Sequence, residues 1–307
     1  MDKKKLLVLI DSVNCAKTAL IHAKQKALQD SKHIDIVAFS YEDTGNILFS
    51  LSPEQVLAIQ DKQLSLLRAT LEPLLKKELT DCEYTFQTVW HESPEQWLNN
   101  EINATNYDMA IKTRHIDAQT QFSELDWQLI RFSPIPLYLA ADNKWRNNCN
   151  VLAALDLGSE KASKHQLNKA IINCGLDYAN SEGCEFYACY TVHVSPILRD
   201  LGIVFSDEQV LNAFEKLPAL QRDLINEYNL RDKLHIKAGL AEQVIPSLAA
   251  KLDAELVIIG SVGNVGIKGK LIGNTAEKIM RLLKTDLLIL PPLNLIPIFL
   301  IKCFILR

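Results

Sequence analysis

Two short, continuous apolar runs, each ending in an aspartate, lie 145 residues apart in the chain. Leu6–Ile10 leads into Asp11, and Val151–Leu155 leads into Asp156. An apolar run without alternation is typical of a strand buried on both faces, and such strands form parallel sheets covered by helices. The two runs therefore predict two parallel sheets, each built around one of them.

The segments that follow the two runs repeat one order of elements. In the first half, the pattern predicts helices near 14–29, 53 onward and 94–103, and further strands at 34–39, 84–90, 108–111 and 135–140. In the second half, it predicts helices near 161–180, 206 onward and 241–251, and further strands at 185–192, 234–237, 255–258 and 286–290. Each half is thus predicted to be a doubly wound α/β domain with a five-stranded parallel sheet.

The domain bounds follow from this repeat. The polar stretch 143–150 reads as a linker, so we expect a first domain at 1–143, a second at 148–293 and an apolar tail at 294–307. Two similar domains in tandem are expected to pack as a pseudo-dimer.

The glycines are distributed unevenly between the halves. Of the eleven, only Gly45 lies in the first half, whereas five lie within fourteen residues of the second: Gly260, Gly263, Gly266, Gly269 and Gly273. This segment lies between a predicted buried strand and a predicted helix. Glycine lets a ligand approach the backbone closely, and a helix N-terminus attracts anions. The segment predicts a site for an anion or a nucleotide phosphate, with a tight turn as the alternative. Asn274 is the predicted N-cap of the helix, completed by Glu277.

Two common phosphate-binding motifs do not fit this segment. A P-loop has four residues between its first glycine and its Gly-Lys pair, but five residues separate Gly263 from Gly269. The dinucleotide motif G-x-G-x-x-G belongs after the first strand of a doubly wound sheet, and it is absent after both Asp11 and Asp156.

The spacing Gly260-x2-Gly263-x9-Gly273, followed by Asn274, resembles the ATP-binding motif of the universal stress protein family. The family motif is Gly-x2-Gly-x9-Gly followed by Ser or Thr. The segment Gly273–Glu277 is similar to tandem-domain members of the E type. The resemblance implies the Rossmann-like fold of the adenine nucleotide α-hydrolase group. It also implies a stress-response regulatory protein that binds an adenine nucleotide in its C-terminal domain.

The resemblance implies ATP, with or without Mg²⁺, as the ligand. In the family, the aspartate after the first strand lies beside the nucleotide, a valine flanks the adenine, and the glycines with the next residue hold the phosphates. Carried over to this chain, the nucleotide-binding residues are Asp156, Val194, Gly260, Gly263, Gly273 and Asn274. Asn274 departs from the family, because an amide stands where a hydroxyl would cap the helix and donate to phosphate.

The first half lacks the glycines. Aligned on the fourth strand, Thr113, Ile116 and Asp126 take their positions, so we predict that this half does not bind ATP in the same way. Asp126 near a helix start would also repel an anion. Arg114 and His115 are interpreted as exposed turn residues, with a different anion site as the alternative.

Bulk composition narrows the class of protein. A net charge of −4, with 48% apolar and 23% charged residues, is ordinary for a globular protein and gives no broad attraction to nucleic acid. Seven cysteines without a CxxC pair are expected to be small core residues in a reducing compartment. The first apolar run is too short for a signal peptide, and no segment reaches the ~18 apolar residues of a membrane helix. We therefore expect a cytoplasmic protein.

No catalytic motif stands out. The chain has no Gly-x-Ser-x-Gly and no His-Glu-x-x-His sequence, so we expect at most slow ATP hydrolysis. The alternative function is a binding or scaffold protein that holds an apolar or acyl ligand or a protein partner. A third possible function is that of a nucleotide-dependent enzyme of the wider α-hydrolase group.

The sequence also allows a homodimer, formed through the edge of the fifth strand or through the apolar tail.

Overall fold

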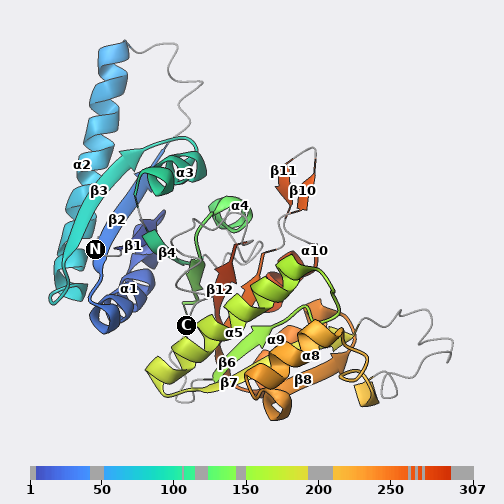
Figure 1. Ribbon diagram of the computed structural model, residues 1–307. Coiled ribbons are helices and arrows are strands. Elements are labelled where there is room, and N and C mark those ends of the chain that lie inside the picture. Colours follow the sequence, from blue (N-terminus) through green and yellow to red (C-terminus); the bar gives the residue numbers. More distant parts are fainter. Residues whose placement is uncertain are drawn as a thin grey trace. The chain divides into compact units, whose positions relative to one another are not determined.

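The computed structural model describes residues 5–41, 52–105, 107–114, 124–142, 150–192, 210–261, 264–266, 269–271 and 274–291. The chain divides into two compact units, Met1–Asp142 and Asn143–Arg307. Figure 1 colours the first from blue to green and the second from green to red. The apolar tail predicted at 294–307 lies outside the described residues.

The N-terminal unit is built on a parallel sheet whose central strand is the first apolar run. In sheet order the strands are β3 (Tyr84–Trp90), β2 (His33–Ser40), β1 (Lys5–Ile10), β4 (Tyr107–Thr113) and β5 (Leu137–Ala140). Residues Leu6 to Ile10 of β1 are buried, as expected for a strand covered on both faces. The connecting helices are η1 (Val13–Cys15), α1 (Ala16–Asp30), α2 (Pro53–Glu78), α3 (Pro94–Ala104) and α4 (Glu124–Phe132).

The helices of this unit pack in two pairs, α1 beside α2 and α3 beside α4. Helix α2 begins with the predicted serine start. The Ser52 hydroxyl accepts from the Gln55 amide, and the Ser52 amide donates to the Gln55 side chain, which satisfies two otherwise unpaired donors.

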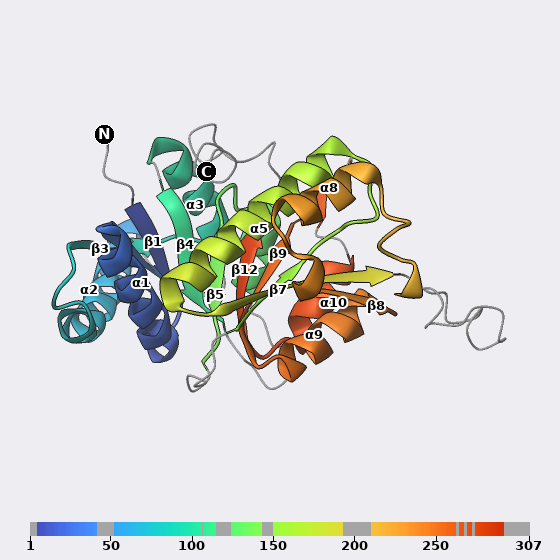
Figure 2. The same ribbon diagram turned by 60° about the horizontal axis from the view of Figure 1, so that its bottom comes forward.

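The C-terminal unit repeats this order. Its parallel strands are β12 (Asp286–Leu290), β9 (Ala254–Gly260), β6 (Asn150–Ala154), β7 (Glu185–Val192) and β8 (Leu234–Ala238). Its helices are α5 (Ala162–Glu182), α8 (Ala219–Glu227), η3 (Arg231–Lys233), α9 (Ala241–Lys251) and α10 (Asn274–Leu282). A small antiparallel pair, β10 (Asn264–Gly266) and β11 (Gly269–Leu271), lies between β9 and α10 in the sequence. Figure 2 shows α5 and α8 near one another, with α9 and α10 together elsewhere.

Both units therefore have the predicted fold class, a doubly wound parallel sheet, and the strand order is the same in each. The winding reverses between β1 and β4 in the first unit and between β6 and β9 in the second. In such sheets this switch point opens a crevice outside the carboxyl ends of the two strands. The packing of the repeats as a pseudo-dimer stays a prediction.

The helix predicted from residue 206 onward is wrong in its length, because it is interrupted. A single long helix was expected from residue 206, but the described residues show turns at 212–217 and a new helix, α8, only from Ala219. Pro218 is the N-cap of α8 and explains why the new helix begins at Ala219, whereas the helix before it already ends at Leu211.

The cysteines differ from the expected small core residues at several positions. Among the described cysteines, Cys189 is buried as expected, whereas Cys15, Cys82 and Cys174 are only partly buried. Cys184 is disulfide-bonded. The sequence did not predict this bond, because pairing depends on how close two Cα atoms come in the fold. Across the described ranges, no helix combines the length and the apolar character needed to cross a membrane.

Candidate functional site

The switch point of the C-terminal unit brings two predicted site residues to one edge of the sheet. Strands β6 and β9 pair in parallel, with Ala153 opposite Ile258. Asp156 follows the end of β6, and Gly260 is the last residue of β9. Both therefore lie at the carboxyl edge, where ligands of doubly wound folds bind.

The glycine-rich segment runs from this edge to a helix N-terminus. The amide of Ser261 donates to the Leu290 carbonyl (2.7 Å), which fixes the chain as it leaves β9. Strands β10 and β11 then form a hairpin with Gly266 opposite Gly269. Helix α10 begins at Asn274 itself, one position before the start that the predicted cap requires. The strand and the helix on either side were predicted, whereas the hairpin was not.

Not every predicted site residue can be placed. Val194, Gly263 and Gly273 lie outside the described residues, as does the side chain of Asn274.

Gly260 has a structural reason to be glycine. A Cβ atom built there would lie 2.6 Å from Leu167 Cδ2 and 3.2 Å from Ile171 Cδ1. Both side chains belong to α5, so the missing Cβ lets this helix cross the end of β9 closely. Helix packing alone accounts for this glycine, before any phosphate is considered.

Asp156 has a fixed backbone and an accessible carboxylate. Its amide donates to Asn168 Oδ1 (3.1 Å), and Asn168 Nδ2 donates to its carbonyl (2.9 Å). Its side chain is 50% exposed and accepts an ion pair from Lys164 Nζ at 2.9 Å. Lys164 stands in the first turn of α5. The carboxylate is therefore held at the crevice while keeping accepting capacity toward solvent.

A pair of buried amides shapes the loop that carries Asp156. Asn168 Nδ2 also donates to Gln221 Oε1 (3.1 Å), and Gln221 Nε2 donates to the Ser159 carbonyl (2.8 Å). Both side chains are buried, so they join α5, α8 and the loop after β6 within the core. Sequence reasoning missed both residues. The available signal was one polar side chain among the apolar positions of each helix.

Tyr190 approaches the same loop from β7. Its hydroxyl lies 2.6 Å from the position that a Cβ atom would take at Gly158. Burial, followed by the negative charge of Asp156, raises the pKa of the phenol, so it stays a neutral donor. An accepting carboxylate and a neutral hydroxyl are suited to sugar hydroxyls and base edges, and the N-terminus of α10 is suited to phosphate. The described residues thus supply an acceptor, a neutral donor and a helix N-terminus, which are the kinds of group that a phosphorylated polar ligand requires.

The same place in the N-terminal unit is closed by an ion cluster. Lys112 Nζ lies 2.8 Å from Asp11 Oδ2 and 2.7 Å from Asp126 Oδ1, and it donates to the Thr113 carbonyl (3.1 Å). Lys112 and Asp126 are both 0% exposed. Because Asp11 follows β1 and Lys112 lies on β4, the bridge crosses the switch point.

Thr113 occupies the position of Gly260, as the alignment predicted. In each unit the residue that follows donates its amide to the end of the fifth strand: Arg114 to Ala140 (2.8 Å), and Ser261 to Leu290 (2.7 Å). The Thr113 hydroxyl donates to the Cys15 carbonyl and accepts from the Ala19 amide (2.9 Å). The threonine thereby bonds the end of β4 to the start of α1.

Two interpretations of this region are wrong. Arg114 is 3% exposed, so it is not an exposed turn residue. Asp126 lies in the first turns of α4, but it is buried against Lys112 and presents no repelling charge to solvent. The polarity of the sequence could not show that Arg114 is buried or that Asp126 is paired with Lys112 inside the fold. His115 and Ile116 lie outside the described residues.

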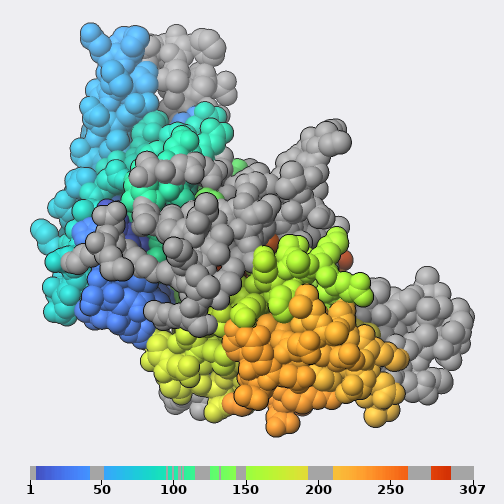
Figure 3. All heavy atoms as spheres, in the orientation of Figure 1, coloured from blue at the N-terminus to red at the C-terminus, as the bar shows by residue number. Residues whose placement is uncertain are grey.

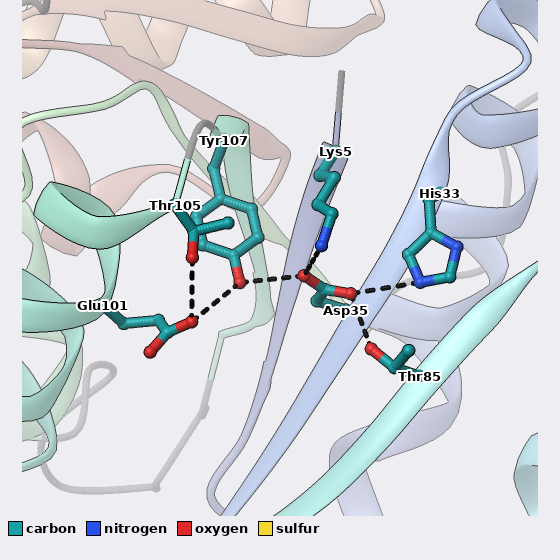
Figure 4. Close-up of polar contacts among 7 residues, drawn as sticks. All are labelled: Lys5, His33, Asp35, Thr85, Glu101, Thr105 and Tyr107. Atoms are coloured by element: carbon teal, nitrogen blue, oxygen red, sulfur yellow. Dashed lines mark hydrogen bonds and ion pairs between the residues drawn. The ribbon is translucent and has the colours of Figure 1, made fainter. Parts of the chain in front are cut away.

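A second polar network of the N-terminal unit lies at the opposite edge of the sheet (Figure 4). The buried Asp35 carboxylate accepts from Thr85 (2.6 Å), Tyr107 (2.9 Å) and Lys5 (3.0 Å), and His33 Nε2 lies 3.1 Å from it. These side chains lie at the amino ends of β1 to β4, away from the crevice. With four partners on one carboxylate, the network is a structural support of the sheet.

Comparison with known proteins covers both units. Residues 149–291 match the model described as the universal stress protein family. The chain is 29% identical to universal stress protein E of Salmonella typhi over 267 residues, which cover 84% of each protein. It is 27% identical to the universal stress protein E homolog of Haemophilus influenzae over 310 residues, covering 95% of this chain and 98% of that protein.

Among solved structures, a functionally unknown protein from Pseudomonas aeruginosa PAO1 shares the fold over the full length. Its TM-score is 0.70 at 23% identity, and the match covers 100% of this chain and 98% of that one.

Proposed function

This chain belongs to the universal stress protein family, and from that premise we propose that its C-terminal unit binds an adenine nucleotide, with ATP as the ligand. We propose further that the protein is a stress-response regulatory protein of the cytoplasm rather than an enzyme with rapid turnover. The relatives named universal stress protein E match most of this chain, which supports a tandem protein of the same kind.

The observation that carries the proposal is the accessible carboxylate at the switch point of the C-terminal unit, together with the glycine-rich segment beside it. Asp156 lies at the switch point with a half-exposed carboxylate, and the glycine-rich segment leads from Gly260 on the neighbouring strand to the N-terminus of α10. A hydrogen-bond acceptor on one side and a helix N-terminus on the other suit the two ends of a nucleotide.

In this proposal each group has a stated role. Asp156 accepts from ribose hydroxyls, and Val194 flanks the adenine. The backbone from Gly260 and Gly263 to Gly273 and Asn274 holds the phosphates, because free amides and the helix dipole favour negative charge there. Mg²⁺ would accompany the phosphates.

The N-terminal unit is proposed not to bind ATP. Lys112 and Asp11 already bond across its switch point, and Thr113 fills the position of the first glycine. A nucleotide would have to displace a buried ion cluster, which is costly because each separated charge loses its partner.

The test is calorimetric titration of the full chain with ATP and Mg²⁺. We expect a micromolar dissociation constant and one site per chain. Gly263→Val is expected to abolish binding, because a side chain there prevents close approach of phosphate to the backbone. The matched control is Gly45→Val, at the single glycine of the first half, which is expected to bind like the parent.

Two results contradict the proposal. If the parent does not bind ATP, the alternative of a binding or scaffold protein for an apolar ligand or a partner gains support, and mass spectrometry of co-purified molecules is the next measurement. If two equivalent ATP sites per chain are found, the N-terminal crevice is open and our interpretation of Lys112 is wrong.

A further inference from the structure

Two buried amide side chains lie between two helices of the C-terminal unit. Asn168 on α5 is 1% exposed and Gln221 on α8 is 0% exposed, and Asn168 Nδ2 donates to Gln221 Oε1 (3.1 Å). In Figure 3 the yellow-green surface of α5 meets the gold and orange surface that includes α8. An apolar pair could join the two helices without the cost of desolvating two amides. The choice of amides therefore draws attention to the other polar groups that they bind.

Those polar groups belong to the backbone of the loop after β6. Asn168 bonds both backbone groups of Asp156, since it accepts from the amide at 3.1 Å and donates to the carbonyl at 2.9 Å. Gln221 Nε2 donates to the Ser159 carbonyl at 2.8 Å. Because a carbonyl can only accept, the amino group of Gln221 must face Ser159, which leaves its oxygen for Asn168. Gln221 thereby fixes which way round the Asn168 amide lies.

The loop directs the Asp156 side chain outward between two buried neighbours. Leu155 and Leu157 are buried, whereas the Asp156 side chain is 50% exposed. Bonds to the amide and to the carbonyl of one residue fix the two peptide planes beside it, and these planes determine where its side chain points. The amide pair therefore sets the direction of the carboxylate at the C-terminal switch point.

The N-terminal unit has a different residue at the position of Asn168. Asn168 lies twelve residues after Asp156, and the residue twelve after Asp11 is Ala23, which is buried in α1. The fold therefore accepts a small apolar residue at this position. In that unit the aspartate side chain is bonded to Lys112 (2.8 Å). The asparagine thus occurs in the unit whose aspartate remains accessible to a ligand.

We propose that Asn168 and Gln221 are positioning residues for nucleotide recognition, which hold the Asp156 carboxylate where it accepts from the vicinal hydroxyls of a ribose. The inference rests on the proposed nucleotide site and adds the sugar that this site selects, a ribose rather than a 2′-deoxyribose. The two oxygens of one carboxylate reach both hydroxyls only when the carboxylate is correctly oriented. A site that bonds a hydroxyl discriminates against the analogue that lacks it, so losing this orientation reduces the preference as well as the affinity.

The test is calorimetric titration of the full chain with ATP and with 2′-deoxyATP, in the presence of Mg²⁺. The parent is expected to bind ATP about 10-fold more tightly than 2′-deoxyATP. Gln221→Met keeps most of the side-chain volume and loses both hydrogen bonds, so it is expected to weaken ATP binding about 10-fold and 2′-deoxyATP binding less. Asn168→Ala, which copies the N-terminal unit, is expected to have the larger effect on both the affinity and the preference.

The matched control is Lys169→Met. Lys169 on α5 pairs with Glu227 on α8 (2.9 Å), so this variant also loses a bond between the two helices, but the pair includes no residue of the loop. It is expected to bind both nucleotides as the parent does. Circular dichroism and thermal unfolding check that the variants are folded. If Asn168→Ala or Gln221→Met does not fold, the other variant decides the question.

A double-mutant cycle separates positioning from a general loosening of the unit. Asp156→Ala removes the carboxylate and is expected to bind ATP and 2′-deoxyATP with nearly equal affinity. Because Gln221 is proposed to act through this carboxylate, adding Gln221→Met to Asp156→Ala is expected to cause little further loss of ATP affinity. A merely structural role would weaken binding by the same factor with and without the carboxylate.

Failure of this inference can be distinguished from failure of the proposed function. The inference alone is overturned if the parent binds ATP but has no preference over 2′-deoxyATP, or if Gln221→Met keeps the parent's preference. Equal factors on the two sides of the double-mutant cycle overturn it as well. A parent that binds no ATP overturns the proposed function and this inference together.

Discussion

The two switch points of this protein have the same position in the fold and different contents. In the N-terminal unit, Lys112 reaches across from β4 to Asp11 and closes the crevice with a buried ion pair. In the C-terminal unit, the equivalent Asp156 turns to Lys164 on α5, and its carboxylate remains half exposed. The two units share one strand order although their helices differ in length, so a few residues at the carboxyl edge decide whether a crevice stays open.

The first position of the glycine motif shows the same contrast. Thr113 uses its hydroxyl to bond the start of α1, whereas Gly260 lets α5 lie against the strand through Leu167. One unit fixes its helix by hydrogen bonds and the other by close packing. A glycine can therefore be required at this position even without a ligand.

The largest effect on the difference between the two crevices is expected from replacing the lysine of the closed crevice. Lys112→Met leaves the buried Asp126 without its cation and is expected to reduce the free energy of unfolding of the N-terminal unit by about 3–5 kcal/mol. Urea unfolding followed by hydrogen exchange in each unit measures this, since a chain of two units need not unfold in one step.

The control for Lys112→Met adds Asp11→Asn and Asp126→Asn, which remove the stranded charges. The triple variant is expected to recover much of the loss. A cost below about 1 kcal/mol for Lys112→Met alone would mean that the cluster does not hold the crevice closed.

The stabilities of the two units are expected to depend on pH in opposite directions. In the C-terminal unit, burial, followed by repulsion from Asp286 and Glu182, raises the pKa of Glu255 to about 7 from an ordinary 4.5. The folded state then binds the proton more tightly than the unfolded chain. The free energy of unfolding of this unit is therefore higher below pH 4.5 than above pH 7, and it falls as the pH rises through about 7; because solvent screens the half-covered side chain, we expect a difference of about 2 kcal/mol rather than the full value of the shift.

Asp35 gives the N-terminal unit the reverse dependence. Burial, the largest influence, would raise the pKa of Asp35, but hydrogen bonds from Thr85, Lys5 and Tyr107 outweigh it and hold the pKa below the ordinary 3.8. This stabilisation is present above pH 3.8 and is lost as the pH falls through the lower folded value.

Thermal unfolding of the parent and of Glu255→Gln from pH 3 to 9 tests both statements. The variant should lose the decline of stability between pH 4.5 and 7, while the loss of the N-terminal unit in acid remains. Identical profiles for the two proteins would contradict the assignment to Glu255.

A smaller effect is expected from Gly260→Ala. The added methyl group meets Leu167 and Ile171, and such overpacking costs about 1–3 kcal/mol. Combining it with Leu167→Ala makes room, so the double variant should lose less than the sum of the single losses. Additive losses would show that α5 does not pack on Gly260 as described. Urea unfolding of the C-terminal unit provides the values.

The smallest effect is expected at the open crevice itself. Lys164→Met breaks the ion pair with the half-exposed Asp156, and exposed pairs contribute at most about 1 kcal/mol. Its unfolding curve should nearly coincide with that of the parent, in contrast to Lys112→Met. A loss as large as that of Lys112→Met would erase the distinction between the two crevices.

Much of the fold could be predicted from the sequence because its apolar runs are sharply bounded. Strands 84–90, 185–192 and 286–290 and helix 241–251 have the same ends in the sequence pattern and in the structure. The fourth strand was predicted to end at Ile111, before two polar residues, whereas β4 continues to Thr113. Polarity marks where a strand could end, but it does not show that a partner on another element compensates the charge.

The candidate site was predictable only in part. Asp156 and Gly260 meet at one edge because strand order follows from the repeat. The hydrogen bond between Asn168 and Gln221, which fixes the loop after β6, forms only because α5 packs against α8. The packing of one helix against another belongs to the tertiary structure and cannot be predicted from the periodicity of apolar residues along each helix. The bridge of Lys112 could have been suspected, since Asp11 ends the strand beside β4.

The bridge from Lys112 to Asp11 also provides an internal reference for thermal measurements on the whole chain. A ligand raises the melting temperature of the unit that binds it, to an extent set by its concentration relative to its dissociation constant. A unit whose crevice is bonded within itself has no such response. A compound that shifts only the C-terminal transition then binds that unit, whereas one that shifts both transitions acts through the solvent or the chain as a whole.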